Sequence, residues 1–140
     1  MPTLKNNTTQ IPSIHINQVG QGLAVLHSAC AKEEYLYYIG YSYYKLGYYN
    51  DAFNYINESI LLDSLNTNAF SLRGTINTEL EKYELSIEDY NKAIELDSLN
   101  KYPYNNMGWI YMIKRNYDSA LKYYDKAISL DSNFIISYRQ

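Results

Sequence analysis

The sequence is poor in the residues that build most catalytic and metal sites. Its 140 residues include one cysteine and two histidines, His15 and His27. A single cysteine excludes an intramolecular disulfide and any zinc site built from several cysteines. Two histidines would leave a catalytic metal centre dependent on carboxylates for its other ligands. We therefore predict a protein that is not an enzyme and that holds no metal and no cofactor.

Excess positive charge and long apolar runs are lacking as well. Twelve lysines and arginines stand against 15 aspartates and glutamates, for a net charge of −3. This balance disfavours a general nucleic-acid binder, which needs a basic surface. No apolar run approaches the length of about 18 residues that a membrane-spanning helix requires. We predict a cytoplasmic protein, with a lipoprotein anchored at Cys30 as a minor alternative because small residues precede that cysteine.

Tyrosine is the residue that the sequence has in excess. There are 18 tyrosines but only three phenylalanines and one tryptophan, Trp109. Hydrophobic residues make up 46% of the chain, enough to form a packed core. The tyrosines therefore have to be divided between core packing and exposed binding surface.

A repeat of 34 residues organises most of the sequence. The segment Tyr90-Asn-Lys-Ala-Ile-Glu-Leu-Asp-Ser98 returns 34 residues later as Tyr124-Asp-Lys-Ala-Ile-Ser-Leu-Asp-Ser132. Two further sets of residues keep the same offset: Gly40, Gly74 and Gly108, and Tyr49, Tyr83 and Tyr117. Such a fixed period is the mark of a stacked repeat architecture. The units span residues 33–66, 67–100 and 101–134.

Each unit has the pattern of two helices joined by a turn. In the first unit Leu36, Ile39 and Tyr43 recur at helical spacing, and a second helical run follows Gly47. Asn66 and Asn100 precede the next units and are predicted to cap their first helices. Each unit is therefore predicted to form two antiparallel helices.

These motifs resemble the tetratricopeptide repeat family. Unit three matches its pattern through Tyr104-x2-Met107-Gly108-x2-Tyr111 and Ala120-x3-Tyr124, whereas unit two departs from it at Arg73 and Asn77. The resemblance implies an all-α, right-handed solenoid of helix-turn-helix units. It also implies a protein–protein interaction module that serves as a scaffold or adaptor.

The resemblance further implies a concave groove lined by the first helix of each unit. We expect this groove to be aromatic and asparagine-lined and to bind a peptide or a helix. Some family members clamp a carboxylate, but of the matching positions here only Asn106 is polar, so we expect no such clamp. The predicted groove residues are Tyr37, Tyr38, Tyr41, Tyr44, Asn68, Leu72, Thr75, Tyr102, Asn105, Asn106, Trp109 and Met112.

The ends of the chain lie outside the three units. Residues 1–32 are predicted to be a partly flexible segment with a helix over 14–31, which could fold over the groove. No Pro, Gly, Asn or Asp lies between Leu23 and Ile39, so the first helix of unit one is predicted to begin well before residue 33. Residues 135–140 are expected to start a truncated fourth unit or a cap.

Two other functions remain open from the sequence. The protein could self-assemble into a homo-oligomer through its uncapped C-terminal end. Residues 14–22 also resemble the first strand and loop of metallo-β-lactamase-like hydrolases, which would make the chain an inactive remnant fused to repeats, because the metal motif is missing. Scattered carboxylates, including Glu84, Glu88 and Asp89, are expected on solvated helix surfaces.

Overall fold

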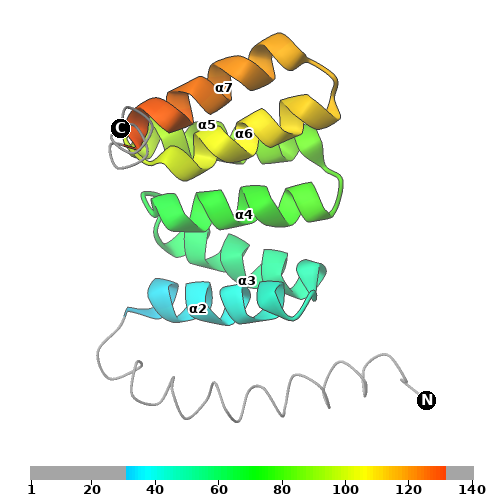
Figure 1. Ribbon diagram of the computed structural model, residues 1–140. Helices are drawn as coiled ribbons and strands as arrows, with labels where there is room; N and C mark the ends of the chain where they lie inside the picture. The colour runs from blue at the N-terminus through cyan, green and yellow to red at the C-terminus, as the bar shows by residue number, and fades with distance from the viewer. Residues whose placement is uncertain (1–30, 132–140) are drawn as a thin grey trace, which may run out of the picture.

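Six helices in three stacked pairs make up the part of the chain that the structure describes. The computed structural model describes residues 31–131, so the predictions for 1–30 and 132–140 lie outside it. Within this span no strand is present, and the helices pair in chain order and stack in layers (Figure 1). The all-α fold predicted from the repeat is confirmed. The helices are α2 (Lys32–Lys45), α3 (Tyr49–Leu62), α4 (Thr67–Glu79), α5 (Tyr83–Leu96), α6 (Lys101–Ile113) and α7 (Tyr117–Leu130).

Side-chain caps fix the starts of the first helices as predicted. The Asn66 side chain accepts a hydrogen bond from the backbone N–H of Ala69 at 3.0 Å, and Asn100 accepts one from Tyr102 at 3.0 Å. Each bond satisfies one of the amide groups left free in a first helical turn. The same side-chain chemistry at Asn116 caps α7, a position that the sequence reasoning did not single out.

The start of α2 differs from the expectation. The prediction that the first helix begins well before residue 33 is wrong, because Ala31 has an extended backbone, with φ −66° and ψ 158°, and the helix begins at Lys32. Glu33 and Glu34 occupy the first turn. Carboxylates there are favoured by the positive end of the helix dipole, which explains a start at this point.

Glycine allows the two helices of each unit to pack closely. A Cβ on Gly40 would lie 2.5 Å from Cδ1 of Ile56, and one on Gly74 would lie 2.9 Å from the Tyr90 ring. Gly108 stands in the same relation to Tyr124, at 2.8 Å. The repeated glycine of the first helix therefore makes room for the large side chain of the second helix.

The middle unit replaces an aromatic pair with a polar network. In units one and three, Tyr43 stacks on Tyr55 with ring centroids 5.3 Å apart, and the Tyr111 and Tyr123 rings stack at 5.4 Å. The corresponding residues of unit two are Asn77 and Asp89. The Asn77 amide donates to the Asp89 carboxylate at 3.0 Å, so polar contact takes the place of stacking.

Arginine completes this network and extends it to the preceding unit. Nε and Nη2 of Arg73 donate to the two carboxylate oxygens of Asp89, at 3.0 and 2.7 Å, and Nη1 donates to Asn57 on α3 at 2.7 Å. Asp89 is buried, so the expectation that it lies on a solvated surface is wrong. Its charge is tolerated there because Arg73 and Asn77 satisfy it.

The turn inside each unit uses a left-handed residue at one repeated position. Gly47, Glu81 and Arg115 have φ values of 82°, 59° and 58°. Residues with a side chain are strained in this region, by roughly 1 kcal/mol, whereas glycine is not. The first unit therefore has the favoured residue at this turn, and the other two units do not.

Replacing the strained residues with glycine should stabilise the protein. We expect Glu81→Gly and Arg115→Gly each to raise the free energy of unfolding by about 0.5 kcal/mol, because relief of strain exceeds the added entropy of the unfolded chain. Gly47→Ala should lower it by about 1 kcal/mol. Urea unfolding followed by circular dichroism measures all three, and stabilisation by Gly47→Ala would contradict this account of the turn.

Breaking the polar network should cost far more than removing an exposed carboxylate. Asp89→Ala leaves the Arg73 guanidinium partly buried without its counter-charge, which we expect to lower stability by about 3 kcal/mol. Glu88→Ala, one residue away and exposed, is the control and should change it by less than about 0.5 kcal/mol. The triple change Arg73→Met, Asn77→Tyr and Asp89→Tyr copies unit three and should restore stability, as thermal unfolding would show.

Candidate functional site: the face formed by the first helices

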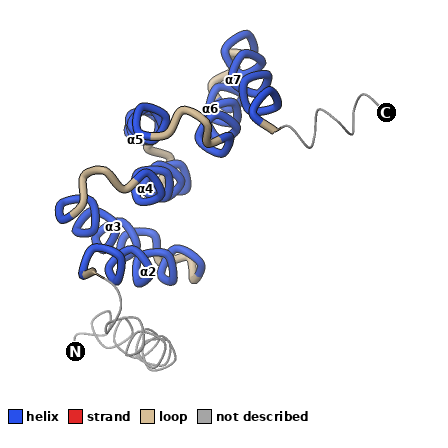
Figure 2. The backbone as a smooth tube through the Cα atoms, turned by 90° about the vertical axis from the view of Figure 1, so that its left-hand side faces the viewer, coloured by secondary structure: helices blue, strands red, loops and turns tan. Residues whose placement is uncertain are grey.

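The first helices of the units lie next to one another along one side of the stack. In Figure 2, α2, α4 and α6 follow one side of the stack, and α3 and α5 lie on the other side, toward the left of the view. The helices α2 and α4 are in direct contact, as are α4 and α6. This face is the one that the sequence analysis predicts to be the groove.

Four tyrosines form a continuous aromatic surface on α2, here called the tyrosine row (Tyr37, Tyr38, Tyr41 and Tyr44). The Tyr37 and Tyr41 rings are stacked with centroids 6.4 Å apart, and Tyr38 meets Tyr37 edge-on at 5.4 Å. Tyr44 continues the row at 6.5 Å from Tyr41. The Tyr37–Tyr41 and Tyr41–Tyr44 contacts follow from helical spacing, which places residues three and four apart on one face.

Beside the tyrosine row lie two hydroxyl groups, one from Tyr90 on α5 and one from Thr75 on α4. Tyr90 of α5 is 1% exposed, and its hydroxyl lies 2.9 Å from Oγ1 of Thr75 on α4. Burial raises the pKa of Tyr90, while hydrogen bonds with Thr75, Thr78 and Asn106 partly oppose that rise. The pKa of Tyr44 is raised by burial first and then by the nearby Glu79, with Tyr90 a smaller contributor. The Tyr90 hydroxyl therefore reaches this face at Thr75.

Sequence reasoning missed the part that Tyr90 plays in this face. Tyr90 is absent from the predicted groove residues. In the structure its ring fills the space beside Gly74. No sequence pattern could show that its hydroxyl passes beneath α4 to reach Thr75 and Asn106, because that contact depends on how the units cross.

Unit three supplies the other exposed aromatic residues. Trp109 on α6 is 56% exposed, and Tyr102 and Met112 on the same helix are exposed too. The Lys101 ammonium lies 5.5 Å from the Tyr102 ring centroid, a distance suited to a cation–π contact. Asn68 on α4 and Asn105 on α6 present exposed amides between these aromatic groups.

Two of the predicted groove residues do not face solvent freely. Leu72 is buried in the core with Ile56 and Ile60 of α3, so it cannot line an open groove. Asn106 is half-buried and lies near the hydroxyl of Tyr90 on α5. Both stand at the same place in the repeat, which faces the second helix of the preceding unit and is taken by Tyr38 on α2. Tyr37, Tyr44 and Thr75 are half-buried as well.

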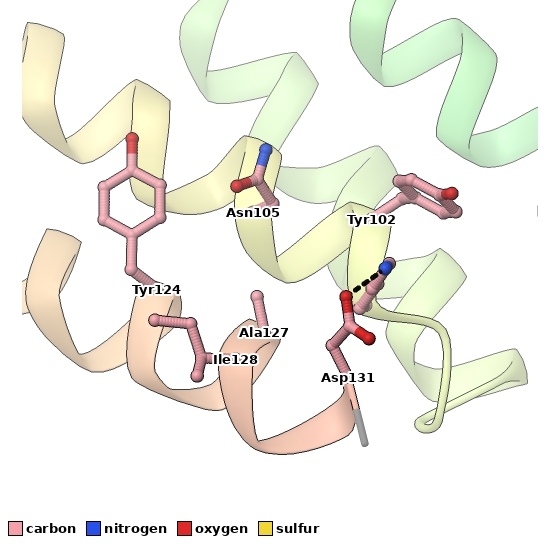
Figure 3. Close-up of a pocket in the computed structure, with 7 residues that line it drawn as sticks. Tyr102, Asn105, Tyr124, Ala127, Ile128 and Asp131 are labelled. Atoms are coloured by element: carbon pink, nitrogen blue, oxygen red, sulfur yellow. Dashed lines mark hydrogen bonds and ion pairs between the residues drawn. The ribbon is translucent and has the colours of Figure 1, made fainter. Parts of the chain in front are cut away.

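A cavity opens where this face meets the last described helix. It has a volume of about 440 Å³ and lies between α6 and α7, with Tyr124 and Ile128 on one side and Asn105 on the other (Figure 3). An ion pair between Lys101 and Asp131 closes one edge. The cavity is therefore mainly apolar, with its charged edge neutralised.

The chemistry of the face suits binding by contact. Its charged groups are few, chiefly Glu34, Glu79 and Lys45. Among residues 31–131, no group of three or more histidine, cysteine or acidic side chains is placed to hold a metal ion. No helix in that span is long and apolar enough to cross a membrane. The side chains of this face offer ring stacking, burial of apolar surface and hydrogen bonding by amides.

Comparisons with known proteins agree with this architecture. The chain is similar to MamA in a crystal structure, at 27% identity and a TM-score of 0.70, over 82% of this chain and 67% of that one. It is similar to the Arabidopsis OM64 TPR domain at 25% identity and a TM-score of 0.70, over 72% and 84% of the two chains. A third match is the TPR2B domain of yeast Sti1 in a pHsp70 complex, at 25% identity and 0.70, over 73% and 82%.

Matches to family sequence models cover all three helix pairs. No curated protein sequence matches the chain. Two models described as tetratricopeptide repeat match residues 33–64 and 67–98 and residues 102–134. These boundaries agree with the 34-residue units and together include more than half of the chain. The chain belongs to the tetratricopeptide repeat family.

Proposed function

We propose that the protein is an interaction module, a scaffold or adaptor, that binds a segment of a partner protein on the face of the first helices. One observation carries the proposal: exposed aromatic side chains lie on two helices of this face, Tyr41 on α2 and Tyr102 and Trp109 on α6. Tyrosine and tryptophan combine a large apolar body with a polar group and are enriched at binding hot spots. The pHsp70 complex of yeast Sti1, a similar protein, supports a binding role.

The partner segment is bound through apolar side chains rather than through a terminal carboxylate. The family positions that clamp a carboxylate are occupied here by Tyr37, Tyr41, Leu72, Tyr102 and Asn106, none of which carries a positive charge. Burying a carboxylate without a cation or several hydrogen-bond donors is unfavourable, because the free energy of its lost hydration is not compensated. The amides of Asn68 and Asn105 instead hydrogen bond to the backbone of an extended or helical segment and set its position.

Trp109 provides a direct test because it is the sole tryptophan of the sequence. Peptides selected from a random phage-displayed library on the full-length chain should shift the Trp109 emission on binding. We expect Trp109→Ala and Tyr41→Ala each to weaken binding at least tenfold, or about 1.4 kcal/mol, because each removes a large contact surface. Calorimetry measures the affinity, and circular dichroism checks that helicity is kept.

The matched control is Leu85→Ala, which truncates an exposed side chain on α5 outside this face. Its affinity should stay within about twofold of that of the unaltered protein. Equal affinity of Trp109→Ala, Tyr41→Ala and Leu85→Ala for the selected peptides would place the binding surface elsewhere and contradict the proposal.

A further inference from the structure

The outer face of α7 is the counterpart of two faces that are buried elsewhere in the chain. We define it as Tyr117, Leu121, Tyr124 and Ile128. The 34-residue frame aligns these residues with one set on α5 and one set on α3, and both sets are large and apolar. The aligned residues are Tyr83, Ile87, Tyr90 and Ile94 on α5 and Tyr49, Phe53, Ile56 and Ile60 on α3.

The next first helix covers each of the two earlier faces. Ile56 and Ile60 of α3 lie in one buried cluster with Leu72 and Ile76 of α4. Tyr90 of α5 lies in a second cluster with Met107 and Ile110 of α6, and Tyr83 and Ile87 pack against it. A face of this composition therefore takes an apolar helix wherever the described chain provides one.

On α7 no described residue provides that cover. Tyr117 is 59% exposed, Leu121 62% and Ile128 44%. Tyr124 and Ile128 of this face also line the cavity of about 440 Å³ between α6 and α7 (Figure 3). An exposed apolar face with a cavity of this kind indicates an interaction site.

The opposite end of the described array presents the complementary surface. Leu72 of α4 and Asn106 of α6 pack against the preceding second helix, and the residue at their place on α2 is Tyr38, which is 41% exposed. Ile76 and Ile110 are fully buried at the preceding junctions, and Ser42 takes their place on α2. The Ser42 hydroxyl is satisfied by the Tyr38 carbonyl at 2.9 Å, so it needs no partner when covered.

We infer that the occupant of the outer face of α7 is a second copy of this chain, stacked head to tail. The α2 helix of one copy covers α7 of the next, with Tyr38 and Ile39 over Tyr124 and the cavity. The contact repeats the junction between units, so the solenoid continues from copy to copy. Such an interface is heterologous: an assembly of any length keeps one free α2 face and one free α7 face at its two ends, so it grows with concentration.

Complementation between two blocked variants tests this arrangement on the full-length chain. Leu121→Glu places a charge on the α7 face, and Tyr38→Glu places one on the α2 face. Light scattering coupled to size exclusion should show a mass that rises with concentration for the unaltered protein and a monomer for each variant. A mixture of the two variants should form dimers and nothing larger, because each variant retains one intact face.

The control is Leu85→Glu, an exposed leucine on α5 outside both faces, which should associate as the unaltered protein does. Circular dichroism verifies folding, and Ile128→Glu replaces Leu121→Glu if the latter does not fold. Three results would overturn the inference: an unaltered protein that stays monomeric, association that survives both blocking variants, or a mixture that stays monomeric. Association lost in Leu121→Glu but kept in Tyr38→Glu would assign the face to symmetric α7 pairing instead.

Deletion of residues 133–140 distinguishes two possible occupants of the α7 face: a second copy of the chain and the chain's own C-terminal segment. Deletion should leave the concentration dependence of the mass and the free energy of unfolding unchanged if a second copy covers α7. A deletion that lowers the free energy of unfolding of a monomer would assign the α7 face to that segment and overturn the inference.

Discussion

Close approach of the two helices within each unit is the contact on which the structure depends. A glycine on the first helix leaves space for one large side chain of the second: Ile56 against Gly40, Tyr90 against Gly74 and Tyr124 against Gly108. Since a Cβ at any of the three glycines would lie within 3 Å of that side chain, the distance between the helices is fixed by sequence. The tilt of each pair, and hence the line of first helices that forms the candidate face, follows from this distance.

The same contact explains how core and surface share one set of tyrosines. Tyr90 packs against Gly74 with its ring and sends its hydroxyl to Thr75, so a core residue also shapes the floor of the face. Dispersion and burial hold the ring in place, while the hydroxyl finds polar partners near the surface. A tyrosine is suited to both tasks in a way that phenylalanine is not, which gives the composition of this chain a physical reason at such positions.

The 34-residue frame predicted the fold well because it reports on local periodicity and on caps such as Asn66 and Asn100. The four tyrosines of the row were predicted from the resemblance to the family, which assigns the first helices to the groove. The 34-residue frame could not predict that Leu72 and Asn106 turn toward the preceding unit, which depends on how units stack. Nor could it place Asp89 in the core, because a buried carboxylate is identified only by the side chains around it, here Arg73 and Asn77.

The network around Asp89 also bears on how the three repeats keep their order during folding. Units of similar sequence can exchange partners between copies or pair out of register. A middle second helix paired with the first helix of another unit would bury Asp89 against Tyr43 or Tyr111, without Arg73 to neutralise it. The ionic contact thus favours pairing of the two middle helices with each other. It raises the free energy of shuffled and domain-swapped arrays relative to the native one.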